Sequence, residues 1–280
     1  MTVCIIQGKI SFSFAVASAT SYLSQHHTFT NHRDKDPDGF AAEPVLLFND
    51  YPKGHVKRTA MHAYQSLYFL LVLAGYWHSA VFNMAEVWDV QDRGAKKVGM
   101  ALNNNSWIAS RAKYAVCLRL LYHITNVVLP LSTNPSWTTV GHINCMGIAG
   151  SLTLGILFTL SHNFENAERD PTESFRRTGE PVCWCQSQVE TSSTYGGLLS
   201  GWLTGGLNYQ IEHHLFPRMS TAWYPYIAPT VRRICHKHQV RYVYYPWMWQ
   251  NFVSTLRYTH AMGTGIVPWK IKKNPYKGDM

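Results

Sequence analysis

The chain has 280 residues, of which only 15% are charged and 14% are aromatic. Ordinary soluble proteins carry about 25% charged residues, and Trp and Tyr concentrate at membrane interfaces, so this composition favours a membrane protein. The formal net charge of +9 comes without a nucleic-acid-binding motif, and the six cysteines have neither metal-site nor disulfide spacing. We therefore expect reduced thiols and no nucleic-acid partner.

The N-terminal residues 1–24 are weakly apolar and contain a single charge, Lys9. They resemble a secretory signal peptide only loosely because their positively charged start is poor. A histidine pair follows directly, since His26 and His27 stand in the stretch QHHTFTNH. We treat 1–24 as a separate segment that precedes the first candidate for a functional site.

Two long apolar segments, 114–132 and 143–161, are separated by a short link without charge. About 20 mostly apolar residues suffice to cross a bilayer. Arg and Lys flank the pair on both sides, and the positive-inside rule therefore places both flanks in the cytosol and the link on the far side. The pattern predicts a transmembrane helical hairpin whose second span ends at His162.

Two other apolar stretches are harder to interpret. Residues 64–82 are long enough to span but contain Gln65 and His78, and GGLLSGWLTGG at 196–206 is too short to span. The glycines of 196–206 indicate either close helix packing or room for a bound acyl chain.

The stretch NYQIEHHLFPRMS contains the second histidine pair, His213 and His214, with Gln210 one helical turn earlier. On a helix these three residues share a face, although the two histidines point about 100° apart. Imidazole is a ligand for iron, zinc and copper. Three separated segments, which contain His26 and His27, His162, and this motif, therefore predict a metal site at one membrane face.

The motifs QIEHHLFP, SHNFE and HHTFTNH before DPD resemble those of the front-end, delta-5/delta-6 type, membrane fatty acid desaturases over residues 25–265. The resemblance implies an all-α membrane fold, with a transmembrane hairpin and a cytosolic helical cap that holds two irons. It also implies O₂-dependent insertion of a cis double bond into a polyunsaturated acyl chain, carried as an acyl-CoA or an acyl-lipid. Electrons would come from NADH through cytochrome b5 and its reductase, at the endoplasmic reticulum, with the histidine boxes facing the cytosol.

Carried over residue by residue, the resemblance names six metal ligands, of which His213 and His214 are also catalytic: His26, His27, His162, Gln210, His213 and His214. Glu212 has two interpretations, as a residue that orients a ligand histidine or as a surface carboxylate. The desaturase domain is expected over 25–265 and a basic tail over 266–280.

The chain departs from the family pattern in two places. Leu23 stands where the second box should have its first histidine, and the first box has no counterpart. We therefore expect an N-terminally truncated desaturase, with the alternative of an inactive remnant that only binds lipid or a partner. Because both histidine pairs must face one side of the membrane, we also expect 64–82 to lie in the cytosolic leaflet without crossing.

Overall fold

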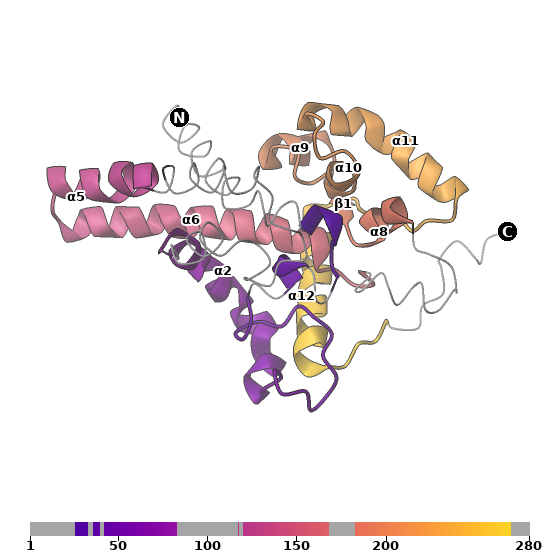
Figure 1. Ribbon diagram of the computed structural model, residues 1–280, viewed down its shortest axis with the longest axis horizontal. Coiled ribbons are helices and arrows are strands. Elements are labelled where there is room, and N and C mark those ends of the chain that lie inside the picture. The colour runs from indigo at the N-terminus through magenta and orange to yellow at the C-terminus, as the bar shows by residue number, and fades with distance from the viewer. Residues whose placement is uncertain are drawn as a thin grey trace. The chain divides into compact units, whose positions relative to one another are not determined.

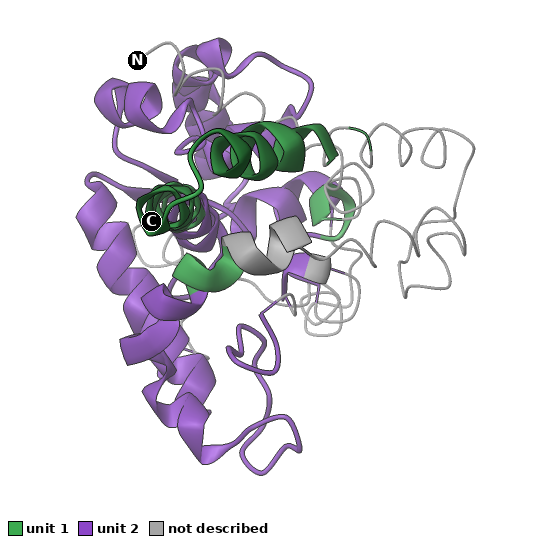
Figure 2. Ribbon diagram, turned by 90° about the vertical axis from the view of Figure 1, so that its left-hand side faces the viewer, with its two compact units in different colours: residues 1–29, 73–153 green, residues 30–72, 154–280 purple. Residues whose placement is uncertain are grey.

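The computed structural model describes residues 26–32, 36–39, 42–82, 117, 120–167 and 183–269, which form a mostly helical protein (Figure 1). The predicted segment 1–24 with Leu23, most of the tail 266–280 and the start of the predicted span 114–132 lie outside the described residues. The chain divides into two compact units (Figure 2): residues 1–29 and 73–153 form unit 1, and residues 30–72 and 154–280 form unit 2.

Unit 1 contains a helical turnaround. The π-helix η4 (Ile124–Val128) runs into α5 (Leu129–Thr133), and α6 (Trp137–His162) begins after three intervening residues. Pro135 disfavours helical backbone at Asn134, which ends α5, and the Thr139 hydroxyl donates to the Asn134 carbonyl over 2.7 Å. This turn is the uncharged link that the sequence predicts.

Helix α6 is, within the described ranges, the one helix long and apolar enough to cross a membrane. Its 26 residues extend about 39 Å at 1.5 Å per residue, which exceeds the roughly 30 Å hydrocarbon core. Only 28% of its most apolar window is buried, so most of its apolar side chains face outward. The described part of the predicted partner span is helical from residue 120 to Thr133, and its crossing stays a prediction.

Helix α2 (Gln65–Phe82) occupies the segment whose role was hard to interpret, and it does not reach the apolarity of a span. Gln65 at its start is buried in unit 2. The Gln65 amide group donates to the carbonyls of Leu47 and Thr259, and its oxygen accepts from the Leu47 N–H. The polar residue that looked anomalous in an apolar run therefore satisfies backbone groups of its neighbours.

Unit 2 contains most of the short elements. They are η1 (Pro37–Gly39), η2 (Ala60–Tyr64), α8 (Trp184–Glu190), β1 (Ser193–Tyr195), α9 (Leu198–Thr204), α10 (Gln210–Leu215), η5 (Thr221–Trp223), α11 (Tyr224–Lys237), β2 (Val243–Tyr245) and α12 (Met248–Thr264). Strands β1 and β2 pair in parallel, from Ser193 opposite Val243 to Tyr195 opposite Tyr245. This pairing ties the chain before α9 to the chain before α12.

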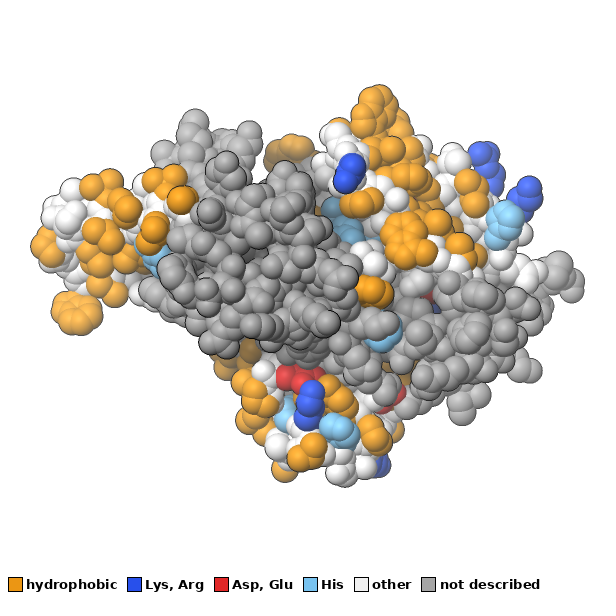
Figure 3. Space-filling view, viewed as in Figure 1, with side chains coloured by type: hydrophobic (Ala, Val, Ile, Leu, Met, Phe, Trp, Pro, Cys, Tyr) orange, Lys and Arg blue, Asp and Glu red, His pale blue; other side chains and the backbone are white. Residues whose placement is uncertain are grey.

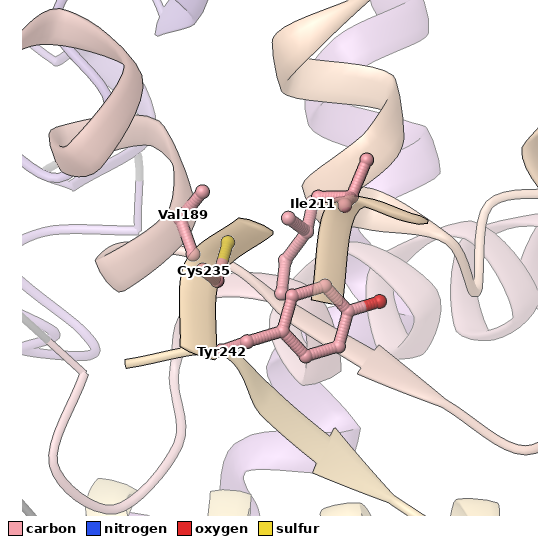
Figure 4. Close-up of a cluster of buried hydrophobic side chains, with 5 residues drawn as sticks. Val189, Ile211, Cys235 and Tyr242 are labelled. Carbon is pink, nitrogen blue, oxygen red and sulfur yellow. The ribbon is translucent and has the colours of Figure 1, made fainter. Parts of the chain in front are cut away.

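The core of unit 2 gathers one side chain from each of several elements (Figure 4). Val189 of α8, Ile211 of α10, Cys235 of α11 and Tyr242 beside β2 pack together with Val231. Burial of such side chains contributes about 1.5–3 kcal/mol each. The cluster therefore fixes α8 and α10 against each other, and these two helices carry the polar residues described next.

Candidate metal centre

The end of α6 is held in unit 2 by hydrogen bonds to its last carbonyls. The Leu160 carbonyl accepts from the Ser193 hydroxyl over 3.0 Å and from the Asn251 amide over 3.1 Å. The last carbonyls of a helix have no partner inside the helix, so these bonds satisfy groups that burial would otherwise leave unpaired. They place His162, the final residue of α6, at a fixed position in the buried interior.

The orientation of the His162 ring is set by the segment that precedes β1. Nδ1 of His162 lies 3.1 Å from the Thr191 carbonyl oxygen. A carbonyl can only accept, so Nδ1 carries the proton and Nε2 carries the lone pair. The side-chain amide of Asn31 donates both to the Thr191 carbonyl, over 3.1 Å, and to the His162 carbonyl, over 3.2 Å.

His214 on α10 is oriented in the same manner. Its Nδ1 lies 2.9 Å from Oε1 of Gln188 on α8, and the Thr30 hydroxyl donates to that same oxygen over 2.8 Å. The amide oxygen again accepts, which leaves the lone pair of His214 on Nε2. His214, Gln188 and Thr30 are all completely buried.

The two lone pairs converge on one point together with Gln210. Nε2 of His162 and Nε2 of His214 are 3.2 Å apart, and Nε2 of Gln210 lies 3.1 Å from the first and 3.2 Å from the second. Gln210 and His214 stand four residues apart on α10 and therefore share a face. We name these three side chains the α6–α10 triangle.

The dimensions of the α6–α10 triangle match those of metal ligands. Imidazole nitrogens bind a first-row ion at about 2.0–2.1 Å, which puts two ligands on neighbouring coordination positions about 3.0–3.4 Å apart. All three edges of the triangle, 3.1 to 3.2 Å, fall in that range. A half-turn of the Gln210 amide would present its oxygen as the third donor. The triangle thus fits one face of the coordination shell of a single ion.

His213, the neighbour of His214, points elsewhere. Its Nδ1 lies 3.2 Å from the Tyr224 hydroxyl, and it is only partly buried. The helical spacing predicts one shared face for Gln210, His213 and His214, but only Gln210 and His214, four residues apart, meet in the triangle. The 100° step between neighbouring helical residues accounts for the difference.

Glu212 is neither a surface carboxylate nor bonded to a ligand histidine, which were its two interpretations from the sequence. It is fully buried, and it contacts the Tyr242 hydroxyl at 2.8 Å and the Thr194 hydroxyl at 3.1 Å. Both hydroxyls donate to the carboxylate. Burial raises the pKa of Glu212, and the hydrogen bond from Tyr242 opposes the rise. Glu212 therefore fastens α10 to β1 and to Tyr242, on the side of the helix that does not carry the triangle.

The first histidine pair lies in unit 1. His26 and His27 are adjacent in a short helical turn, with their ring centroids 5.7 Å apart and their planes nearly perpendicular. Whether they join His162 and His214 stays a prediction. The residues that sequence reasoning missed are Thr30, Gln188 and Thr191, which orient the rings from positions far away in the sequence.

Comparison with known proteins identifies the family. Residues 19–246 match the family described as "Fatty acid desaturase". The chain is 35% identical over 246 residues to an acyl-lipid (7-3)-desaturase of Rebecca salina, a match that covers 86% of this chain and 52% of that protein. It is 28% identical over 284 residues to acyl-lipid (8-3)-desaturase B of Dictyostelium discoideum, covering 95% of this chain and 58% of that protein.

The chain therefore belongs to the fatty acid desaturase family, which consists of membrane-bound, O₂-dependent oxidoreductases. Its similar relatives are front-end desaturases, and the chain spans about half of their length. No solved structure matches the chain.

Proposed function

We propose that the protein is a front-end acyl-lipid desaturase that inserts a cis double bond into a polyunsaturated acyl chain with O₂ and a histidine-ligated iron centre. The observation that carries this proposal is the α6–α10 triangle, in which two buried imidazoles have their Nδ1 protons committed and their Nε2 lone pairs converging. The relatives are named acyl-lipid desaturases, and this favours an acyl-lipid over an acyl-CoA as the substrate.

The ligand set is proposed in two groups. His162, Gln210 and His214 would hold one iron through the atoms of the triangle. His26, His27 and His213 are proposed from the resemblance as ligands of the remaining positions, in which His213 would turn away from Tyr224. When bound, an iron pair supplies the activation of O₂ that removal of two hydrogens from an unactivated CH₂–CH₂ unit requires.

The protein's own residues would prepare this site in three ways. The Thr191 carbonyl and the Gln188 amide oxygen fix each ring with its lone pair inward, so metal binding needs no change of tautomer. Burial of His162 and His214 excludes bulk water from the reacting position. The bonds to the Leu160 carbonyl hold the ligand at the end of the membrane helix, where an acyl chain leaves the bilayer.

Electrons are proposed to come from NADH through cytochrome b5 and its reductase, with the site at the cytosolic face of the endoplasmic reticulum. These two assignments rest on the family. The alternative is an inactive remnant that binds lipid or a partner. Iron content separates the two proposals, because a remnant would be purified without iron.

The test is to express the chain with the variants His162→Ala and His214→Ala in a host that lacks the product, and to measure both new unsaturated acyl chains and iron per chain. We expect both variants to lose product and to lose iron, because each removes one corner of the triangle. His236→Ala on the exposed side of α11 is the matched control, and this variant should keep product formation and bound iron. A wild-type chain that forms no product and binds no iron would refute the enzyme proposal in favour of the remnant.

A further inference from the structure

Helix α9 carries its large apolar side chains on its outer face. Leu198, Leu199, Trp202 and Leu203 have exposed fractions between 68% and 78%. Their spacing of i, i+1, i+4 and i+5 puts them on one face of the helix. Surface helices of soluble domains show the opposite pattern, with the apolar face turned to the core.

The inner face of α9 is small and polar, and the helix is fixed in this orientation. A Cβ added to Gly201 would lie 3.2 Å from the Tyr209 ring, so the helix backbone packs closely against that ring. The Thr204 hydroxyl donates to the Asn208 side chain, and the Asn208 amide donates to the Tyr195 carbonyl over 2.8 Å. The outward leucines are therefore held outside by specific contacts on the other face.

The exposed apolar surface continues onto η5 and α11. A Cβ added to Gly206 would lie 2.6 Å from Cβ of Thr221, so the end of α9 touches the start of η5. Trp223 and Tyr226 follow, both exposed, with their ring centroids 5.9 Å apart. Figure 3 shows hydrophobic side chains gathered over this part of unit 2, at the upper right. We call the six residues the α9 patch: Leu198, Leu199, Trp202, Leu203, Trp223 and Tyr226.

The segment that carries the α9 patch, residues 196–245, has exposed charges of one sign. Residues 196–245 are all described, and they contain one acidic residue, Glu212, which is buried. The same range contains five basic residues, which are Arg218, Arg232, Arg233, Lys237 and Arg241. The one side-chain carboxylate of this range is thus hidden, so the exposed charges of the segment that carries the patch are basic. The acidic residue Glu190, which precedes this range, contacts Arg241.

Helix α6 brings a candidate membrane span to this surface. The last turns of α6 belong to unit 2, where Leu157 and Leu160 pack against Tyr195. Helix α9 begins three residues after Tyr195. A helix that crosses the bilayer and ends here keeps this part of unit 2 at the level of the lipid headgroups.

We propose that the α9 patch lies in the headgroup region of the membrane that α6 crosses, with the neighbouring arginines and lysine contacting anionic phospholipid headgroups. An apolar face inserted about 5–10 Å below the headgroups, Trp and Tyr at the interface, and basic residues beside them are the features of an interfacial helix. The assignment rests on α6 and on membership of a membrane-bound family, and it does not depend on the metal centre.

The first test measures the tryptophan fluorescence of the full chain in phospholipid nanodiscs that each contain one chain. The nanodiscs are prepared with ordinary lipids and with lipids brominated near the top of the acyl chains. The emission of Trp202 is obtained by subtracting the spectrum of Trp202→Phe. The emission of Trp184, which is 45% exposed at the start of α8, is obtained in the same way with Trp184→Phe. We expect blue-shifted Trp202 emission that is mostly lost in brominated discs, while Trp184 keeps its emission. A water-like Trp202 spectrum that brominated lipid leaves unchanged, or equal quenching of both residues, overturns the assignment.

The second test asks which partner covers the patch. Discs of phosphatidylcholine alone are compared with discs that also contain phosphatidylserine, and we expect stronger quenching of Trp202 in the anionic discs. Trp202 emission that becomes protected only when a second chain or an acidic soluble protein is added overturns the lipid assignment. Because lipid quenching is measured without iron or substrate, a dead enzyme with a quenched Trp202 would refute the proposed function and leave this inference standing.

Discussion

At the scale of single residues, the candidate site depends on which ring nitrogen of each histidine carries the proton. Thr191 and Gln188 each offer an oxygen acceptor to Nδ1, and the lone pairs at Nε2 then meet Gln210. The sequence could predict His162, Gln210 and His214 because their spacing and their place at a helix end are local features. It could not predict Thr30 or Gln188, because their partner His214 lies 184 and 26 residues away, respectively.

The substitution Gln188→Leu should weaken metal binding while leaving the three donor atoms of the triangle in the chain. Loss of such an orienting partner typically costs 10–100-fold in metal affinity, so we expect a loss of about that size in competition with a chelator. Gln186→Leu on the same helix is the control, because Gln186 bonds to Glu190 and not to the site. Equal iron affinity in both variants would show that Gln188 does not orient His214 for a metal.

The variant His213→Ala tests the residue that the structure directs toward Tyr224. If His213 is a ligand in the metal-bound state, product formation should be abolished while membrane insertion is unchanged. Tyr224→Phe should retain activity, because it removes only the hydroxyl that contacts Nδ1 of His213. Acyl-chain analysis of both variants is the measurement, and a His213→Ala chain with normal product would exclude His213 from the metal site.

At the scale of elements, α6 was predictable because a long apolar run has few alternatives, whereas α9 was not. The sequence GGLLSGWLTGG gives no indication of which face of the helix turns outward. That orientation comes from Tyr209 and Asn208, which pack against Gly201 and Thr204. Gly201 packs closely against the Tyr209 ring, while the leucines of the same segment are exposed.

The attachment of α10 by Glu212 gives a prediction about stability. Glu212→Ala leaves the buried Tyr242 hydroxyl without its acceptor, and this should lower the free energy of unfolding by about 1–3 kcal/mol. Glu212→Gln keeps an acceptor and should cost less. Thermal unfolding in mild detergent would measure the stability of both variants. Equal losses of stability in Glu212→Ala and Glu212→Gln would show that the bond to Tyr242 contributes nothing.

The buried carboxyl group of Glu212 also predicts that stability depends on pH. Burial raises the pKa of Glu212 above its ordinary value of 4.5, so the folded state disfavours the ionised carboxylate. The wild-type chain should therefore lose stability as the pH rises from 4.5 through the raised pKa, and Glu212→Gln should lack this slope.

At the scale of the whole molecule, the family and the candidate span α6 define a membrane protein, and the predicted sidedness can be tested. A hydrophilic loop with an N-glycosylation acceptor, inserted in the turn between Asn134 and Ser136, should be glycosylated because that turn is predicted to face the lumen. The same loop inserted after Gln239, in the exposed turn that follows α11, should remain unmodified. Glycosylation at Gln239 would place the candidate metal centre on the wrong side of the membrane.

The position of His162 as the last residue of α6 has a consequence for how such a helix can change in length. Deleting one residue from the final turns would rotate the imidazole by about 100° and retract it by about 1.5 Å, which would carry Nε2 away from Gln210 and His214. Deletions at the opposite end of α6, near Trp137, would leave the ring in place and shorten only the lipid-facing part. The helix can therefore adapt to bilayers of different thickness from one end alone, because the chemistry fixes the other.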